Sequence, residues 1–143
     1  MADSPPYRVL FVCVGNSCRS PMAEALARYK HGDVIDPTSC GLAPASIIQA
    51  NTYECLREVG VPYDKRSPTP LSATDWGGLE LVVNMSGGPI RHLMRGYEGP
   101  DLFWPVPDPI GRSMAAYREA LQLIERLVDD LAHQLRNQPS REG

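Results

Sequence analysis

The sequence has 143 residues, with a hydrophobic share of 43%, a charged share of 22% and a formal net charge of −3. These values are typical of a single globular domain with one core. The negative charge argues against nucleic acid as the main ligand, because binding to a phosphate backbone favours a basic surface. No apolar run approaches the ~18 residues of a membrane span, and the start "MADSPPYR" lacks the features of a signal peptide. We therefore expect a cytoplasmic protein that binds neither nucleic acid nor membranes.

Stretches of strand and helix character alternate along the chain. The apolar run at residues 7–13 predicts a buried strand. Ser20 followed by Pro21 predicts the N-cap and first turn of a helix that ends near Lys30. Further strands are expected at 34–40, 79–85 and 101–106, and further helices at 46–60, 87–96 and from 113 onward. This alternation predicts an α/β fold, in which a parallel β-sheet is covered by helices on both faces.

Several details refine these elements. Pro37 is unfavourable inside the second strand, and Gly60 is expected just past the end of a helix. Apolar residues of the last helix recur at spacings of four and three, which predicts one buried face: Tyr117, Leu121, Ile124, Val128, Leu131 and Leu135. A single domain is expected over 1–143, with frayed ends at about 1–6 and 137–143. The histidines of the predicted helices and several charged residues of the last helix are expected to face solvent, namely His31, His92, His133, Glu125, Arg126, Asp129 and Asp130.

A cysteine lies at the end of the first expected strand. Ligands of parallel sheets bind at the carboxyl ends of the strands, so Cys13 is placed where a ligand is expected. The following segment, "VGNSCRS" at 14–20, turns directly into a helix. The backbone N–H groups of a tight loop and of a helix N-terminus together bind anions. The same positive field favours the thiolate form of Cys13, which would make it a nucleophile.

The side chains of this loop suit an oxyanion ligand. Gly15 lets the loop curl, and Asn16 and Ser20 can hold its shape through hydrogen bonds. Arg19 supplies a planar, two-pronged donor for a tetrahedral oxyanion. The loop lacks the Gly-Lys-Ser/Thr ending of nucleotide-binding loops. The pattern predicts a cysteine nucleophile among oxyanion donors, with substrate contacts from Val14, Gly15, Asn16, Ser17, Cys18 and Ser20.

Asp108 in "PVPDPIG" supplies a carboxylic acid for the same chemistry. Pro109 favours an extended backbone at Asp108, and the strand expected at 101–106 brings Asp108 to the same edge of the sheet. An acid at this place would protonate the leaving oxygen of a phosphate ester and then activate water to hydrolyse a phosphocysteine. An ordinary Asp-Pro turn is the alternative interpretation. Trp104 is expected to pack in the core or, alternatively, to line the cleft.

The segment "FVCVGNSCRSPMAEA" together with the later "VPDP" resembles the low-molecular-weight protein tyrosine phosphatases, a family that also contains arsenate reductases. The resemblance covers nearly the whole chain. It implies a four-stranded parallel sheet flanked by helices. It also implies that Cys13 is the nucleophile, that Arg19 clamps the oxyanion and that Asp108 is the general acid and base.

The resemblance also implies supporting roles. Asn16 and Ser20 would hold the loop, Ser20 would help to stabilise the Cys13 thiolate, and Ser39 would support Asn16. Cys18 would trap an oxidised Cys13 as a disulfide, although a role in loop packing is the alternative for Cys18.

The sequence departs from the tyrosine phosphatases in three respects. Their aromatic residue after the Asp-Pro pair is replaced by Ile110 and Gly111, and "GLAPASIIQA" at 41–50 contains no aromatic residue. The layout of 41–50 and 59–72 is closer to that of the arsenate reductases. Reductases coupled to thioredoxin need two further cysteines after the strand at 79–85, but no cysteine follows Cys55. That route is excluded, whereas a reductase that uses glutaredoxin or a small thiol remains an alternative.

The sequence thus predicts a phosphomonoester hydrolase of the protein tyrosine phosphatase type, acting on a phosphorylated protein or a small phosphate ester without a metal or other cofactor. The alternatives are an arsenate reductase with an external thiol as reductant, and an inactive oxyanion-binding module. The inactive module is disfavoured because Cys13, Arg19 and Asp108 are all present. Cys40 and Cys55 are expected to be packing residues with free thiols, and no second ligand pair suggests zinc.

Overall fold

The computed structural model describes residues 4–139, which form a parallel four-stranded sheet with three α-helices. The elements are β1 (Tyr7–Cys13), α1 (Arg19–His31), β2 (Ile35–Gly41), α2 (Ala50–Glu58), η1 (Leu71–Ala73), β3 (Leu81–Asn84), η2 (Arg91–Leu93), β4 (Asp101–Phe103) and α3 (Met114–Arg136), where η marks a short 3₁₀ helix. The strand order β2-β1-β3-β4 puts β1 in the interior of the sheet. The predicted parallel α/β sheet is therefore confirmed.

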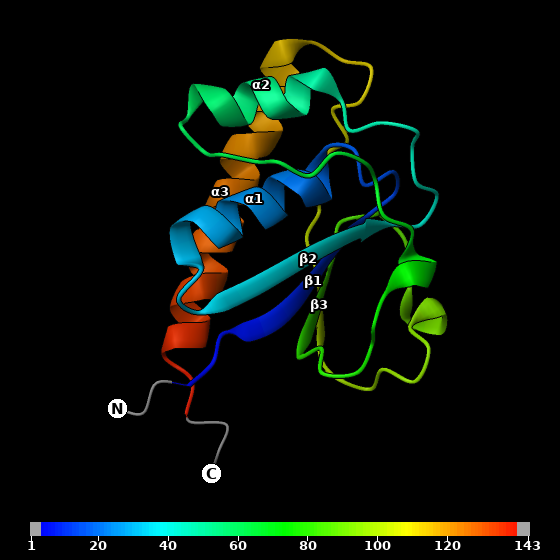
Figure 1. Ribbon diagram of the computed structural model, residues 1–143, viewed down its shortest axis with the longest axis vertical. Helices are drawn as coiled ribbons and strands as arrows, with labels where there is room; N and C mark the ends of the chain where they lie inside the picture. Colours follow the sequence, from blue (N-terminus) through cyan, green and yellow to red (C-terminus); the bar gives the residue numbers. More distant parts are fainter. Residues whose placement is uncertain (1–3, 140–143) are drawn as a thin grey trace.

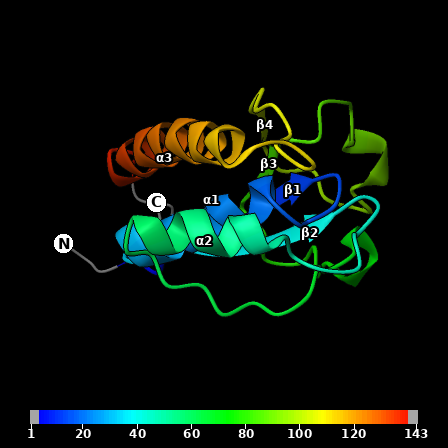
Figure 2. The same cartoon turned by 90° about the horizontal axis from the view of Figure 1, so that it is seen from above.

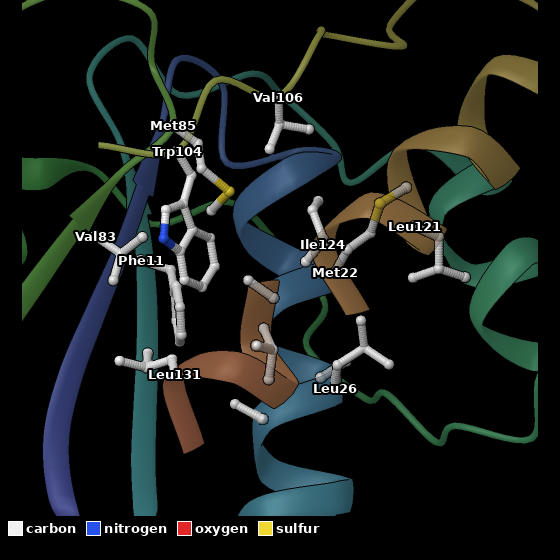
Figure 3. Packing of buried hydrophobic residues seen from close by; sticks show 14 of the residues in the cluster. Phe11, Met22, Leu26, Val83, Met85, Trp104, Val106, Leu121, Ile124 and Leu131 are labelled. Carbon is white, nitrogen blue, oxygen red and sulfur yellow. The ribbon is translucent and has the colours of Figure 1, made fainter. Parts of the chain in front are cut away.

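The three α-helices gather on one face of the sheet, called here the helical face (Figures 1 and 2). On this face Phe11 of β1 packs with Met22 and Leu26 of α1 and with Ile124 of α3 (Figure 3). All six apolar residues predicted for one side of α3 are buried. Most of the apolar surface that holds the domain together is therefore buried between the sheet and these helices.

The opposite face, called here the loop face, is covered by irregular segments and the two 3₁₀ helices. Leu10 and Val12 of β1 pack there against Ile90 and Met94. Helices were predicted on both faces. Among residues 4–139 the α-helices cover the helical face, and only short 3₁₀ helices lie on the loop face. The helix expected at 87–96 shrinks to η2, because the backbone leaves helical geometry at Ile90 and Met94, and Gly87 and Gly96 at the ends of this range adopt positive φ.

Local sequence signals explain where several elements lie. Pro37 is tolerated in β2 because β2 is an edge strand, where a missing backbone N–H can face outward. Gly60 follows the C-cap of α2 with a φ of +76°, as expected of a helix-ending glycine. The side chain of Ser113 caps α3 by accepting a hydrogen bond from the backbone N–H of Ala116.

One expectation about surface charges is wrong. His31 is not free in solvent, because its Nε2 lies 2.7 Å from a carboxylate oxygen of Asp129 and only 13% of its side chain is exposed. Lys30 binds Asp129 and Glu125 on the same side. Since α1 and α3 lie side by side, the end of α1 places these charges against α3 (Figure 1). His92 and His133 are exposed, as predicted.

The ends of the described part of the chain carry no regular secondary structure. Residues 4–6 and 137–139 belong to no helix or strand, and the rest of the predicted frayed ends lies outside the described residues. No helix between residues 4 and 139 is long and apolar enough to span a lipid bilayer.

Candidate active site

Cys13 is the last residue of β1 and is almost completely buried at the carboxyl edge of the sheet. The chain then forms a short loop, and α1 begins at Arg19. The Ser20 hydroxyl oxygen lies 3.0 Å from the Cys13 sulfur, and the Ser20 backbone N–H points to the same sulfur at 3.5 Å. The prediction that Ser20 is the N-cap is therefore wrong. Its hydroxyl serves the loop instead, and Cys18 occupies the N-cap position without a capping side-chain bond.

Asn16 holds the loop in a left-handed turn, with a φ of +51°. Its amide oxygen accepts a hydrogen bond from the backbone N–H of Thr69 at 2.8 Å. Its amide nitrogen donates to the hydroxyls of Ser20, at 2.8 Å, and Ser39, at 3.0 Å. Every donor and at least one lone pair of the amide are thus engaged, which fixes both its orientation and the backbone that carries it. The expected contact of Ser39 with Asn16 is present.

The backbone carbonyls of the loop are bound by the segment that follows β2. The pairs are Leu42 N to Cys13 O, Ala43 N to Val14 O, Ala45 N to Gly15 O and Gln49 N to Ser17 O, at 2.8–3.2 Å. Gly41 permits this close approach, because a Cβ there would lie 2.7 Å from the oxygen of Val14. With these carbonyls turned outward, the backbone N–H groups of residues 14–18 donate to no other group in the described part of the chain. They are available to an anion.

Two loop side chains point away from such an anion. The Ser17 hydroxyl donates to the carbonyl of Ile47 at 2.7 Å, and the Ser17 carbonyl accepts from the hydroxyl of Thr52 at 2.8 Å. The Cys18 sulfur faces the Tyr117 hydroxyl of α3 at 3.5 Å. Substrate contacts from Ser17 and Cys18 would therefore come from their backbone N–H groups.

Arg19 is buried beneath the loop, with only 6% of its side chain exposed. Its Nη1 donates to the carbonyls of Met85, at 2.7 Å, and Val106, at 3.1 Å. These two bonds fix the plane of the guanidinium. Its Nε is fully buried and has no hydrogen-bond partner in the described residues. A buried unsatisfied donor is costly, so this N–H suits a ligand that accepts a hydrogen bond.

Asp108 lies next to Arg19, so the structure brings together two residues that are 89 positions apart in the sequence. The distance between its Oδ2 and the Arg19 Nη2 is 3.3 Å. Its Oδ1 accepts a hydrogen bond from the backbone N–H of Ile110, which steadies the carboxylate. The side chain of Asp108 is 39% exposed and can therefore meet both a bound substrate and water.

A buried polar network behind the loop was not anticipated from the sequence. Glu24 of α1 accepts hydrogen bonds from the hydroxyls of Ser39, at 2.6 Å, and Tyr63, at 2.9 Å. Lys65 donates to the carbonyl and the hydroxyl of Ser39. Burial lowers the pKa of Lys65, while the charge of Glu24 opposes this shift. The spacing of Glu24 four residues after Ser20 on α1 was an available signal, but nothing local marks Tyr63 or Lys65.

The remaining candidates belong to the core. Cys40 and Cys55 are buried, and burial raises the pKa of each thiol to about 12, so both stay protonated near neutral pH. Their prediction as packing residues is confirmed. Trp104 is also buried, and its ring centre lies 5.8 Å from that of Phe11 (Figure 3). The alternative that Trp104 lines the cleft is therefore wrong.

A cysteine and an arginine on one anion-binding loop at the edge of a parallel sheet place the chain among the α/β proteins that handle oxyanions through a thiol. Residues 8–141 match the sequence model of the low molecular weight phosphotyrosine protein phosphatases. The chain belongs to this family.

Relatives with known functions include both phosphatases and arsenate reductases. The chain is 30% identical to a protein-arginine-phosphatase of Geobacillus stearothermophilus, with 93% of this chain and 99% of the relative covered. It is 29% identical to a glutaredoxin arsenate reductase of Synechocystis, with 87% and 95% covered. Among solved structures, an arsenate reductase in the phosphate-binding state superimposes with a TM-score of 0.81 at 26% identity, covering 90% of this chain and 98% of the other.

Proposed function

We propose that this chain is a phosphatase that cleaves phosphate monoesters through a phosphocysteine on Cys13. The observation that carries the proposal is the buried, unpartnered Nε of Arg19 beside a loop whose backbone N–H groups are likewise unused by the described residues. These donors suit the equatorial oxygens of a phosphoryl group. Membership of the low molecular weight phosphotyrosine protein phosphatases supports this ester chemistry.

In the first step the Cys13 thiolate attacks phosphorus while the ester oxygen leaves. Asp108 donates a proton to that oxygen as the bond to phosphorus breaks. Ser20 stabilises the thiolate before the attack, because its hydroxyl lies 3.0 Å from the sulfur. Arg19 and the loop N–H groups hold the oxygens of the phosphoryl group throughout the transfer.

In the second step a water molecule hydrolyses the phosphocysteine. Asp108, now a carboxylate, takes a proton from this water, and the sulfur leaves as a thiolate. The 39% exposure of the Asp108 side chain admits water to it. Inorganic phosphate is released, and the proton on Asp108 restores the starting state.

The side chains that flank the loop are aliphatic. Val14, Ile47 and Ile110 are 40%, 56% and 44% exposed, and Trp104, the aromatic residue nearest to Asp108 in the sequence, is buried. We infer that the phosphorylated group is held by its phosphate and by aliphatic contacts and not by aromatic stacking. A phosphorylated protein and a small phosphate ester can both be held in this way. Their relative turnover measures how far the contacts extend beyond the phosphate.

The test compares hydrolysis of an aryl phosphate with arsenate-dependent oxidation of glutathione in the presence of glutaredoxin. We expect the wild-type protein to release phosphate and the Cys13→Ser variant to be inactive while still binding vanadate, since the loop and Arg19 are retained. Trapping of ³²P on the wild-type protein in an alkaline denaturing quench, absent in Cys13→Ala, would identify the phosphocysteine. Arsenate-dependent thiol oxidation without ester hydrolysis would replace the proposal by a reductase that uses an external thiol as its partner.

A further inference from the structure

A hollow of about 390 Å³ lies directly beside Asp108, between the loop that carries it and the first half of α3. Its floor is formed by Ala116, Ala120 and Leu123, which recur at the spacing of one helical face. The small alanine side chains keep this floor low. Since Asp108 lines the hollow and also binds Arg19, the hollow opens next to the place of the phosphoryl group.

Two arginines stand at this hollow without a partner. The guanidinium groups of Arg112 and Arg126 form no hydrogen bond or ion pair with any described residue. By contrast, Arg118 and Arg136, which lie with Arg126 on α3, each bind a carboxylate, at 2.8 Å. A free guanidinium is therefore not a general property of the α3 arginines, and Arg112 lies in the loop just before this helix.

The hollow is positively charged in a protein that is negative as a whole. Asp108 is neutralised by Arg19, and Glu119 is the other acidic residue in the lining. The two free arginines thus leave an excess of one positive charge at the hollow, against a net charge of −3 for the chain. A patch of this sign next to a phosphate-binding loop attracts an acidic ligand and steers it toward the loop.

We propose that this hollow binds acidic residues of a protein substrate that flank the phosphorylated residue. The ten residue steps from Ala116 to Arg126 correspond to about 15 Å of helix, which is the length of four or five residues of an extended peptide. One acidic side chain near the phosphorylated residue would meet Arg112, and one farther along would meet Arg126. The proposal rests on the proposed phosphatase function, because it requires that the phosphorylated residue is bound at Cys13.

The test uses two series of peptides with one phosphorylated residue, made with phosphotyrosine, a phosphate monoester, or with phosphoarginine, in which nitrogen replaces the ester oxygen. In each series, three glutamates are placed before or after the phosphorylated residue, and a matched peptide carries glutamines instead. We expect kcat/KM to exceed that of the matched glutamine peptide when the glutamates lie on the side of the phosphorylated residue that faces the hollow, either before or after it. The double variant Arg112→Gln/Arg126→Gln should lose about threefold to tenfold on that peptide, through KM, and the preference should vanish at high salt.

Matched controls separate this inference from the function on which it rests. Arg95→Gln removes the same charge from an arginine after η2 that pairs with no carboxylate in residues 4–139 and lines a different hollow from Asp108, and should keep the preference. Replacement of Arg112 and Arg126 by lysine should keep most of it, because the charge is retained. Hydrolysis of a small aryl phosphate should be unchanged in all of these variants. Loss of aryl phosphate hydrolysis in the wild type would contradict the phosphatase, whereas equal turnover of glutamate and glutamine peptides by an active enzyme would overturn only the acidic-substrate site.

Discussion

The Ser20 hydroxyl lies between the Cys13 sulfur, at 3.0 Å, and the amide nitrogen of Asn16, at 2.8 Å. Because Asn16 donates to the Ser20 oxygen, the proton of the Ser20 hydroxyl has two acceptors, the Cys13 sulfur and the more distant carbonyl of Cys40 at 3.4 Å. The sulfur is the nearer acceptor, and a hydroxyl donates best to an anion. Ser20 therefore offers a side-chain donor to the sulfur, as the proposed nucleophilic attack by Cys13 requires.

Replacement of Ser20 by alanine should slow formation of the phosphocysteine by about 10- to 100-fold, the effect of one hydrogen bond to a charged group. Single-turnover kinetics on an aryl phosphate measures this step. Ser39→Ala is the matched control, because it removes a hydroxyl that binds Asn16 but not the sulfur. Its effect should be smaller. Equal rates for Ser20→Ala and the wild type would contradict the role of Ser20.

Replacement of Arg19 by lysine should nearly abolish turnover although the charge is kept. The guanidinium is fixed by two backbone carbonyls and offers its Nε to the ligand. A lysine ammonium is a point charge and cannot present the same two-pronged donor. Affinity for vanadate should fall together with kcat/KM, and a normal melting temperature would show that the fold is intact. Wild-type activity in Arg19→Lys would remove Arg19 from the oxyanion site.

Replacement of Asp108 by alanine should reduce the rate by roughly 10²–10⁴-fold on phenyl phosphate, the usual effect of a general acid. The loss should be smaller on a nitrophenyl ester, whose leaving oxygen needs less protonation. The ratio of the two losses is the decisive measurement. Asp108→Asn serves as the control of similar shape, and it should resemble alanine. If both variants hydrolyse phenyl phosphate like the wild type, Asp108 is not the acid.

Peroxide should inactivate the protein reversibly by forming a disulfide between Cys13 and Cys18. Peroxide converts the Cys13 thiolate to a sulfenic acid, and the Cys18 thiol then displaces water to form the disulfide. Burial raises the pKa of Cys18, although its contact with Tyr117 opposes this, so Cys18 should react only after Cys13 is oxidised. Mass spectrometry should detect the disulfide, and dithiothreitol should restore activity. In Cys18→Ser the Cys13 sulfenic acid has no thiol to trap it, so prolonged peroxide should oxidise it to a sulfinic acid that dithiothreitol cannot reduce. Recovery of that variant to the wild-type extent after the same treatment would contradict a protective disulfide.

The contact of α1 with α3 should make stability depend on pH. Burial opposes the shift, but hydrogen bonds from His31 and Lys30 lower the pKa of Asp129 below its ordinary value. A lowered pKa in the folded state stabilises the protein above the unfolded value of about 3.9, and this gain is lost as the pH falls through the folded pKa. Asp129→Asn should therefore cost up to about 1 kcal/mol of unfolding free energy at pH 7, since the pair is partly exposed.

Urea unfolding of Asp129→Asn and the wild type from pH 7 to pH 3 measures this effect. The difference between the two proteins should shrink below about pH 4. Asp130→Asn is the matched control, because the neighbouring Asp130 is exposed and its side chain binds no described residue. A difference that stays constant with pH would show that the ion pair is not its cause.

Local patterns were sufficient to predict the loop and most elements of the fold. The run that ends at Cys13, the small residues behind it and the helix start are adjacent in the sequence, so their spacing already encodes the anion-binding loop. The stripe from Tyr117 to Leu135 likewise follows from helical periodicity alone. Ser20 was misplaced as a helix cap because a serine before a proline fits a cap equally well. Its bond to Cys13 depends on how the loop folds back.

Tertiary contacts explain what the sequence did not reveal. Glu24 and Lys65 meet behind the loop although 41 positions separate them, and no periodicity links them. His31 was expected in solvent because its own helix gives no sign that α3 lies against it. The uneven covering of the sheet was missed for a similar reason. The segment at 87–96 has helical composition, but its backbone is helical only at Arg91–Leu93 and turns away at Ile90 and Met94.

The hydrogen bonds from residues 42–49 to the loop carbonyls have a consequence for ligand affinity. A loop that had to fold around its ligand would reduce the apparent affinity by the fraction of molecules already in the binding form. Here the backbone that follows β2 holds the carbonyls of Cys13, Val14 and Gly15 through its own N–H groups. The binding form is therefore the resting form of the protein, and a phosphate or vanadate ion should associate in one kinetic phase whose rate rises linearly with its concentration.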